Sequence, residues 1–114
     1  MDKMFEALEW LRNNKNPSAF ATNRFEETEN AINFVEKLYE LGAEEIFVAN
    51  IYDDPEFFED EGGPYADTLI VKLPEDEEKR DKILEIYNYE KEEYDLNYGD
   101  DYYDEEDTLV FWWD

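Results

Sequence analysis

The sequence contains no cysteine and no histidine among its 114 residues. Without cysteine, the chain can form neither disulfides nor thiolate metal sites, and it has no cysteine nucleophile. Without histidine, it lacks the commonest general base near neutral pH and the commonest transition-metal ligand. These two absences exclude several classes of enzyme and metalloprotein, and they leave the redox state of the compartment unspecified.

Basic residues are scarce as well, because ten Lys and Arg face 34 Asp and Glu, which gives a net charge of -24. Such a chain repels nucleic acids and anionic membranes and is attracted to basic surfaces. The charge is uneven: residues 1–49 contain ten acids and five bases, whereas residues 50–114 contain 24 acids and five bases. Exposed charges farther apart than about 8 Å are largely screened at physiological salt, so this local concentration matters more than the total.

Long hydrophobic runs are also missing, since none approaches the roughly 20 residues that span a bilayer. The first six residues contain neither a basic n-region nor an apolar h-region, so no secretory signal is visible. We therefore expect a cytoplasmic protein that contacts neither membranes nor nucleic acid directly. Hydrophobic residues still make up 42% of the chain and aromatic residues 18%, which favours one folded domain over residues 1–114 rather than disorder.

The spacing of apolar residues predicts three helices. The first covers residues 2–13 within an N-terminal element at 1–14, and Trp10 lies off its apolar stripe, where it either packs at the edge or is an exposed contact residue. The second covers residues 28–41, and Gly42 follows it where a left-handed C-terminal cap belongs. The third begins at Pro74 and fades near Tyr89 or Glu90.

Four strands are predicted from β-branched and aromatic residues, at residues 18–22, 45–52, 67–73 and 108–113. Behind the N-terminal helix, the order β-α-β-β-α-β predicts an α+β, ferredoxin-like sandwich over residues 18–114. Its four-stranded antiparallel sheet would have the strands at 18–22 and 67–73 in the centre. The last strand is apolar on both faces, so we expect the extra N-terminal helix, or a second copy of the chain in a homodimer, to cover the second face.

Motifs that carry catalysis or metal binding are not found. With 34 acids, a pair of carboxylates suited to acid–base chemistry carries no information, and no phosphate loop, nucleophile elbow or metal-binding helix motif occurs. The acidic stretches do not fit the 12-residue calcium loop, which needs acids at positions 1, 3 and 5, glycine at 6 and glutamate at 12. The sequence therefore predicts neither an enzyme nor a specific cofactor or metal site.

Two acidic loops, at residues 53–65 and 90–107, mix acids with large aromatic residues. DNA carries one negative charge per about 1.7 Å of axis, and proteins that bind it present rows of Lys and Arg. A folded domain with acids along one flank can occupy such a basic groove, while aromatic side chains stack on arginine. The predicted partner-binding residues are Phe58, Glu92, Glu93, Asp95, Tyr98, Asp100, Asp101, Tyr102, Tyr103, Asp104, Glu105 and Glu106.

The sequence thus predicts a small non-enzymatic binding protein that blocks a basic site on another protein, such as a nucleic-acid-binding protein or a nuclease. It would act as a nucleic-acid mimic or as an immunity-type or anti-defence-type inhibitor. Two alternatives stay open. One is a ligand-sensing or dimerising regulatory domain, which is an analogy from the fold. The other is an acid-surfaced structural protein that has no basic partner.

Overall fold

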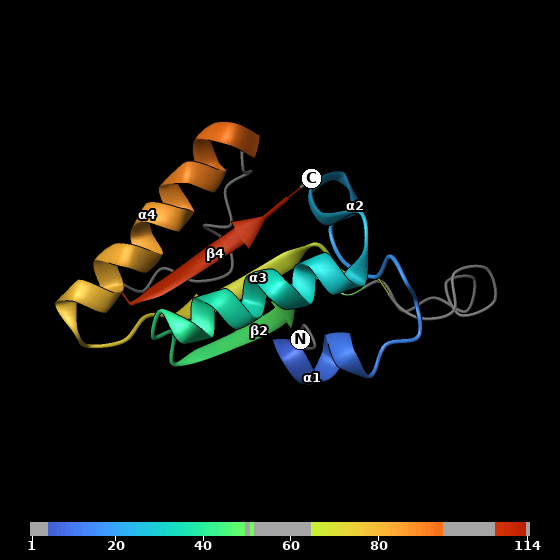
Figure 1. The fold of residues 1–114 in the computed structure, drawn as a ribbon, viewed down its shortest axis with the longest axis horizontal. Coiled ribbons are helices and arrows are strands. Elements are labelled where there is room, and N and C mark those ends of the chain that lie inside the picture. Colours follow the sequence, from blue (N-terminus) through green and yellow to red (C-terminus); the bar gives the residue numbers. More distant parts are fainter. Residues whose placement is uncertain (1–4, 50, 52–64, 95–106, 114) are drawn as a thin grey trace.

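A computed structural model describes residues 5–49, 51, 65–94 and 107–113. Four strands form one antiparallel sheet in the order β1-β2-β3-β4: β1 (Phe5–Glu6), β2 (Glu45–Ala49), β3 (Thr68–Lys72) and β4 (Thr108–Trp112). The helices are α1 (Ala7–Arg12), α2 (Thr22–Phe25), α3 (Thr28–Glu40) and α4 (Glu77–Tyr94) (Figure 1). The α+β class expected from the sequence is confirmed.

The three longer strands pair so that Ile46 of β2 lies opposite Val71 of β3, and Val71 lies opposite Leu109 of β4. Because side chains alternate between the faces of a strand, these residues point to the same side of the sheet. The main core lies on that side, where buried residues of β2, β3 and β4 pack with Ala7 and Leu11 of α1, Val35 and Leu38 of α3, and Ile83 of α4. All three of these helices therefore cover the same face.

Of the two covers expected for the opposite face, the N-terminal helix was wrong, and the homodimer stays a prediction. The opposite face carries a separate small cluster of Ala49, Ile70, Val110 and Phe47, to which α1 contributes no residue. The apolar residues of α1 are instead directed at α3 and β2, and an ion pair between Arg12 and Glu36 links α1 to α3 on the outside. The N-terminal helix thus extends the helical layer.

The predicted strand at residues 18–22 does not form. Only Phe20 pairs, through an isolated parallel bridge with Ala66, because Ala21 has a φ of 36° in the left-handed region and turns the chain into α2. The edge of β3 that this strand was expected to cover is paired with β4 instead. The ferredoxin-like strand order is therefore not confirmed.

The predicted first helix begins later than expected. Phe5–Glu6 forms an edge strand paired with β2, and the carboxylate of Glu6 accepts hydrogen bonds from the backbone N–H groups of Leu8 (3.0 Å) and Glu9 (2.8 Å). These N–H groups are free in the first turn of any helix, so Glu6 caps α1 and fixes its start.

The end of α3 matches the sequence prediction. Gly42 has a φ of 113°, its N–H donates to the carbonyl of Tyr39 (3.0 Å), and the N–H of Ala43 donates to the carbonyl of Leu38 (3.1 Å). This pair of bonds is the Schellman motif, in which glycine adopts the left-handed conformation at little cost. The predicted C-terminal cap at Gly42 is confirmed.

The C-terminal strand ends in an aromatic cluster. Trp113 is fully buried and meets three rings edge-on: Phe20 at 5.8 Å, Phe25 at 5.1 Å and Phe34 at 5.7 Å between centroids. Edge-to-face pairs of this kind are favourable beyond the area they bury. Trp113 thereby joins β4 to α2 and α3 and holds the short segment around Phe20 in place without a regular strand.

Candidate functional site

Two of the predicted partner-binding residues, Glu92 and Glu93, lie in the last turns of α4, and both are exposed. The prediction that residues 90–107 form a loop was wrong at its start, because α4 continues to Tyr94. The other ten predicted residues lie outside the described residues: Phe58, Asp95, Tyr98, Asp100, Asp101, Tyr102, Tyr103, Asp104, Glu105 and Glu106. They stay predictions, as does most of the acidic loop at 53–65.

An exposed aromatic residue stands among the acids of α4. Tyr89 is 56% exposed, and Glu85, Glu92 and Glu93 occupy the positions four before, three after and four after it, all exposed. Residues at these spacings are neighbours on a helix surface. Glu85, Tyr89, Glu92 and Glu93 therefore form one continuous surface, which we call the α4 patch.

A buried ionic contact holds α4 at Glu90, the residue next to Tyr89 in the sequence. Glu90 is only 2% exposed. Its carboxylate accepts hydrogen bonds from Arg24 of α2 (Nε to Oε1 2.8 Å, Nη2 to Oε2 3.0 Å) and from the indole of Trp113 (Nε1 to Oε1 3.1 Å). A bidentate guanidinium–carboxylate pair fixes both distance and orientation. This contact therefore fixes the last turns of α4, from which Tyr89 extends into solvent.

Apolar contacts position the middle of α4. Ile83 is buried in the main core, and the ring of Tyr87 meets Phe111 of β4 edge-on, with 5.1 Å between centroids and an interplanar angle of 87°. Figure 1 shows α4 running alongside β4. The helix therefore presents its acids from a rigid support, which reduces the entropy lost when a partner binds.

An open cavity of about 410 Å³ lies beside the α4 patch, lined by Arg24, Phe34, Lys37, Glu85, Ile86, Tyr89 and Glu90. The guanidinium of Arg24 stands over the rings of Phe25 (4.6 Å) and Phe34 (5.7 Å), and its charge is matched by Glu90. The walls are aromatic and aliphatic with charges of both signs at the rim. Such a cavity can accept a side chain from a partner.

One of the two most acidic stretches of the sequence follows directly on α4. Residues 52–64 and 95–106 contain twelve acids and no base, and residue 95 follows directly on the last residue of α4. Half of the net charge of -24 therefore belongs to these two stretches. The second of these stretches therefore begins in the sequence where α4 ends.

Within the described ranges 5–49, 65–94 and 107–113, no group of three or more acids is arranged to hold a metal ion. None of the helices in this part of the chain is long and apolar enough to cross a membrane. We found no protein-family model, curated protein or solved structure that matches the chain. The α4 patch and its surroundings are therefore the candidate functional site.

The sequence does not indicate Tyr89 as a binding residue, because the predicted third helix fades near Tyr89 or Glu90. A helix continued to residue 94 would have placed Glu85, Glu92 and Glu93 around Tyr89 by spacing alone. The apolar stripe of this helix is narrow, and after Ile83, Ile86 and Tyr87 the sequence is mainly charged. Its last turns therefore give little periodic signal.

Proposed function

We propose that the protein is a small acidic binding protein that occupies a basic site on another protein, of the kind that otherwise binds nucleic acid. It acts as a nucleic-acid mimic or as an immunity-type or anti-defence-type inhibitor. The observation that supports this most directly is the α4 patch, in which one exposed tyrosine is surrounded by three exposed carboxylates on a firmly held helix.

The composition of the α4 patch suits a basic surface. Tyrosine is among the residues that most often dominate the energy of an interface, and its ring attracts a guanidinium by about 0.5–2 kcal/mol. The surrounding glutamates pair with further Lys or Arg side chains. A surface that served only solubility would have no need of a half-exposed aromatic ring among its acids.

The net charge adds a kinetic advantage. Complementary charge raises association rates from about 10⁵–10⁶ to as much as 10⁸–10⁹ M⁻¹s⁻¹ at low salt, and this gain falls as salt rises. Contacts at the centre of an interface mainly set the dissociation rate. We therefore expect the acids to raise the association rate and aromatic residues such as Tyr89 to lower the dissociation rate.

The test is affinity capture with charge-matched variants. The double variant Glu92→Lys/Glu93→Lys changes the α4 patch, whereas Glu40→Lys/Glu75→Lys makes the same charge change at exposed sites near the opposite end of α4. We expect one stoichiometric basic protein to be retained by the wild type and by the control, and lost from the α4 variant. Duplex DNA should compete for this protein.

Two results would count against the proposal. If both double variants lost the captured protein equally, the attraction would be a general effect of charge without a defined site. If nothing basic were retained by the wild type at low salt, the acid surface would serve solvation alone. The dimerising alternative would be favoured by an open sheet face at Val110 and Trp112 or by a symmetric dimer through that face, and it stays a second prediction.

A further inference from the structure

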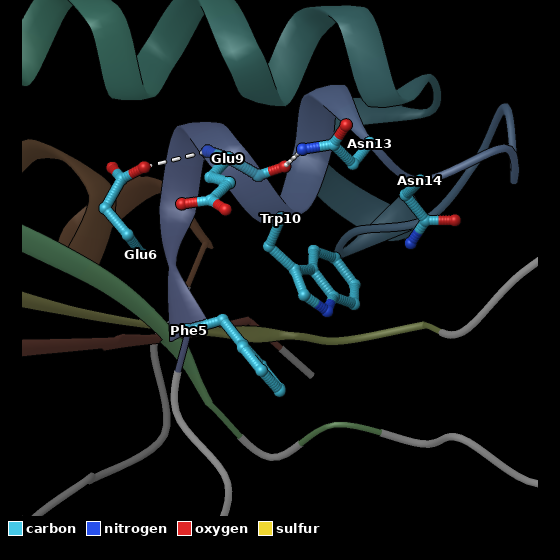
Figure 2. Close-up of a pocket in the computed structure, with 6 residues that line it drawn as sticks. All are labelled: Phe5, Glu6, Glu9, Trp10, Asn13 and Asn14. Carbon is cyan, nitrogen blue, oxygen red and sulfur yellow. Dashed lines mark hydrogen bonds between the residues drawn. The ribbon is translucent and has the colours of Figure 1, made fainter.

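A second hollow lies at the opposite edge of the sheet from α4, where β1 meets α1. It has a volume of about 280 Å³ and is lined by Phe5, Glu6, Glu9, Trp10, Asn13 and Asn14 (Figure 2). Small-molecule pockets usually measure about 300–1,000 Å³. This hollow therefore has the size for one side chain or a small polar group.

Two aromatic rings form the apolar part of this hollow. Phe5 is 47% exposed and, with Tyr89, is one of two exposed large hydrophobic residues in the described part of the chain. Trp10 is partly buried and packs against the main core. Both rings point away from α3 (Figure 2). Trp10 thus packs at the edge of the apolar stripe and also offers a ring to the hollow.

Glu6 supplies a fixed negative charge. Partial burial acts to raise the pKa of Glu6, but hydrogen bonds from the Tyr39 hydroxyl (2.7 Å) and from the backbone of Glu9 and Leu8, with Arg12 nearby, outweigh it, so the pKa is lowered. Glu6 is therefore ionised at neutral pH. Its oxygens are already engaged in capping α1 and holding Tyr39.

Glu9 supplies a second charge that is still available. Its backbone N–H donates to Glu6 and its carbonyl accepts from the Asn13 side chain (2.8 Å), so the residue is fixed on α1. Its carboxylate makes no hydrogen bond or ion pair with another residue of the described ranges. In Figure 2 it lies over the same hollow as the two rings.

We infer that this hollow binds the guanidinium or ammonium group of an arginine or lysine side chain from the partner protein. The rings of Phe5 and Trp10 would contact the cation and its aliphatic stem, and the Glu9 carboxylate would pair with its charge. Aromatic faces attract organic cations, and a carboxylate beside them adds an ion pair. The inference rests on the proposed function only in taking the partner to be basic.

Charge and size favour this occupant over others. Among the described residues that line the hollow there are two carboxylates and no base, so these residues would repel an anionic group. A neutral apolar group would leave the charge of Glu9 next to it without a partner, at a cost in desolvation. A single basic side chain satisfies both the rings and the carboxylate. The partner would then contact the protein at both edges of the sheet.

The experiment uses the intact protein and short capped peptides of the form Gly-Gly-X-Gly-Gly, with X as arginine, lysine or citrulline. Citrulline has nearly the shape of arginine without its charge, so it isolates the contribution of the cation. Binding is followed by NMR through the indole N–H signal of Trp10, assigned with the variant Trp10→Phe. We expect saturable shifts of that signal with arginine and lysine, no saturation with citrulline, and unmoved signals for Trp112 and Trp113.

Variants locate the contact. Glu9→Gln should weaken arginine-peptide binding about two- to fivefold, the range of an exposed ion pair, and Phe5→Ala should weaken it by a similar factor through the lost ring. The exposed control Glu40→Gln should leave binding unchanged. Both affected residues are half-exposed or exposed, so neither change should unfold the protein. An unchanged amide spectrum away from the hollow would show that folding is intact.

Equal binding of citrulline and arginine, or shifts that ignore Glu9→Gln and Phe5→Ala, would overturn the inference. Its failure is separable from that of the proposed function. If arginine peptides fail to bind while the α4 variants still lose a captured basic protein, only the hollow is refuted. If they bind at Trp10 while no basic protein is captured, the cation site stands and the partner assignment falls.

Discussion

The ion pair between Arg24 and Glu90, next to the α4 patch, is the contact whose loss should change stability most clearly. In the variant Arg24→Met, the side chain keeps an apolar stem to pack on Phe25 but loses both hydrogen bonds to Glu90. The Glu90 carboxylate, 2% exposed, would be left with the indole of Trp113 as its partner among the described residues. Burial of a charge without its counter-charge is strongly unfavourable.

The expected size of the effect follows from burial. Removal of one partner of a buried ion pair costs about 3–5 kcal/mol. The Arg24 side chain is 22% exposed, so some solvent can reach the site and we expect a loss of about 3 kcal/mol, at the lower end. The total free energy of unfolding of a folded domain is about 5–15 kcal/mol. The variant Glu90→Gln keeps an oxygen for Trp113 and should lose about 1.5–3 kcal/mol.

The assay is urea unfolding followed by circular dichroism, with an unchanged slope required for the comparison. The double variant Arg24→Met/Glu90→Leu removes both charges and should lose less stability than the sum of the single variants Arg24→Met and Glu90→Leu. If the two single losses added within about 0.5 kcal/mol, the residues would not be coupled. If Arg24→Met were as stable as the wild type, the buried contact between α2 and α4 would not exist.

Three further changes test other parts of the fold. Burial and the Glu6 carboxylate raise the pKa of Tyr39 to about 12 from its ordinary 10.0. The contribution of Tyr39 to the free energy of unfolding is therefore complete below pH 10 and is lost as pH rises towards 12. Tyr39→Phe should reduce the loss of stability between pH 10 and 12, and an unaltered pH profile would show that Tyr39 is not its source. Gly42→Ala should lose about 1–2 kcal/mol in urea unfolding, because its φ is positive and a Cβ would lie 2.7 Å from Lys79 Cδ; no loss would refute the Schellman cap. The indole N–H of Trp112 is buried without a hydrogen-bond partner in the described part of the chain, so Trp112→Phe should leave the free energy of unfolding nearly unchanged. Trp113→Phe loses the hydrogen bond to Glu90 and should lower the free energy of unfolding by about 1–3 kcal/mol. Equal losses in the two variants would contradict this difference.

Part of the fold was predictable because local pattern and tertiary structure agree. β2, β3 and β4 are rich in β-branched and aromatic residues, and each lies where such residues predict a strand. The cap at Gly42 was predictable because glycine has a specific conformational role there. At these three strands and at Gly42, the residue types alone indicate the local backbone conformation.

The segment around Phe20 was not predictable because long-range bonds decide it. The N–H of Ala19 donates to the Thr28 hydroxyl (2.8 Å), and that hydroxyl donates to the carbonyl of Asn16 (2.8 Å). These bonds give the backbone an alternative to a strand. Together with the left-handed Ala21, they fix a compact turn that no short pattern signals, and they leave β3 to pair with β4.

The candidate site was predictable in composition and only partly in position. Glu92 and Glu93 were expected at the binding surface and are exposed on α4, but Tyr89 was missed because the periodicity of the helix is weak. The hollow at Phe5 and Trp10 was missed because it depends on a two-residue strand. Such a strand is too short to leave an alternating pattern.

The most direct test of the central claim is the association and dissociation rates of the captured basic partner over a range of salt concentrations. We predict that Glu92→Lys/Glu93→Lys lowers the association rate and its salt dependence, that Tyr89→Ala mainly raises the dissociation rate, and that Glu40→Lys/Glu75→Lys matches the wild type at moderate salt. If Tyr89→Ala left both rates unchanged and the two charge variants behaved alike, the α4 patch would not be the binding surface.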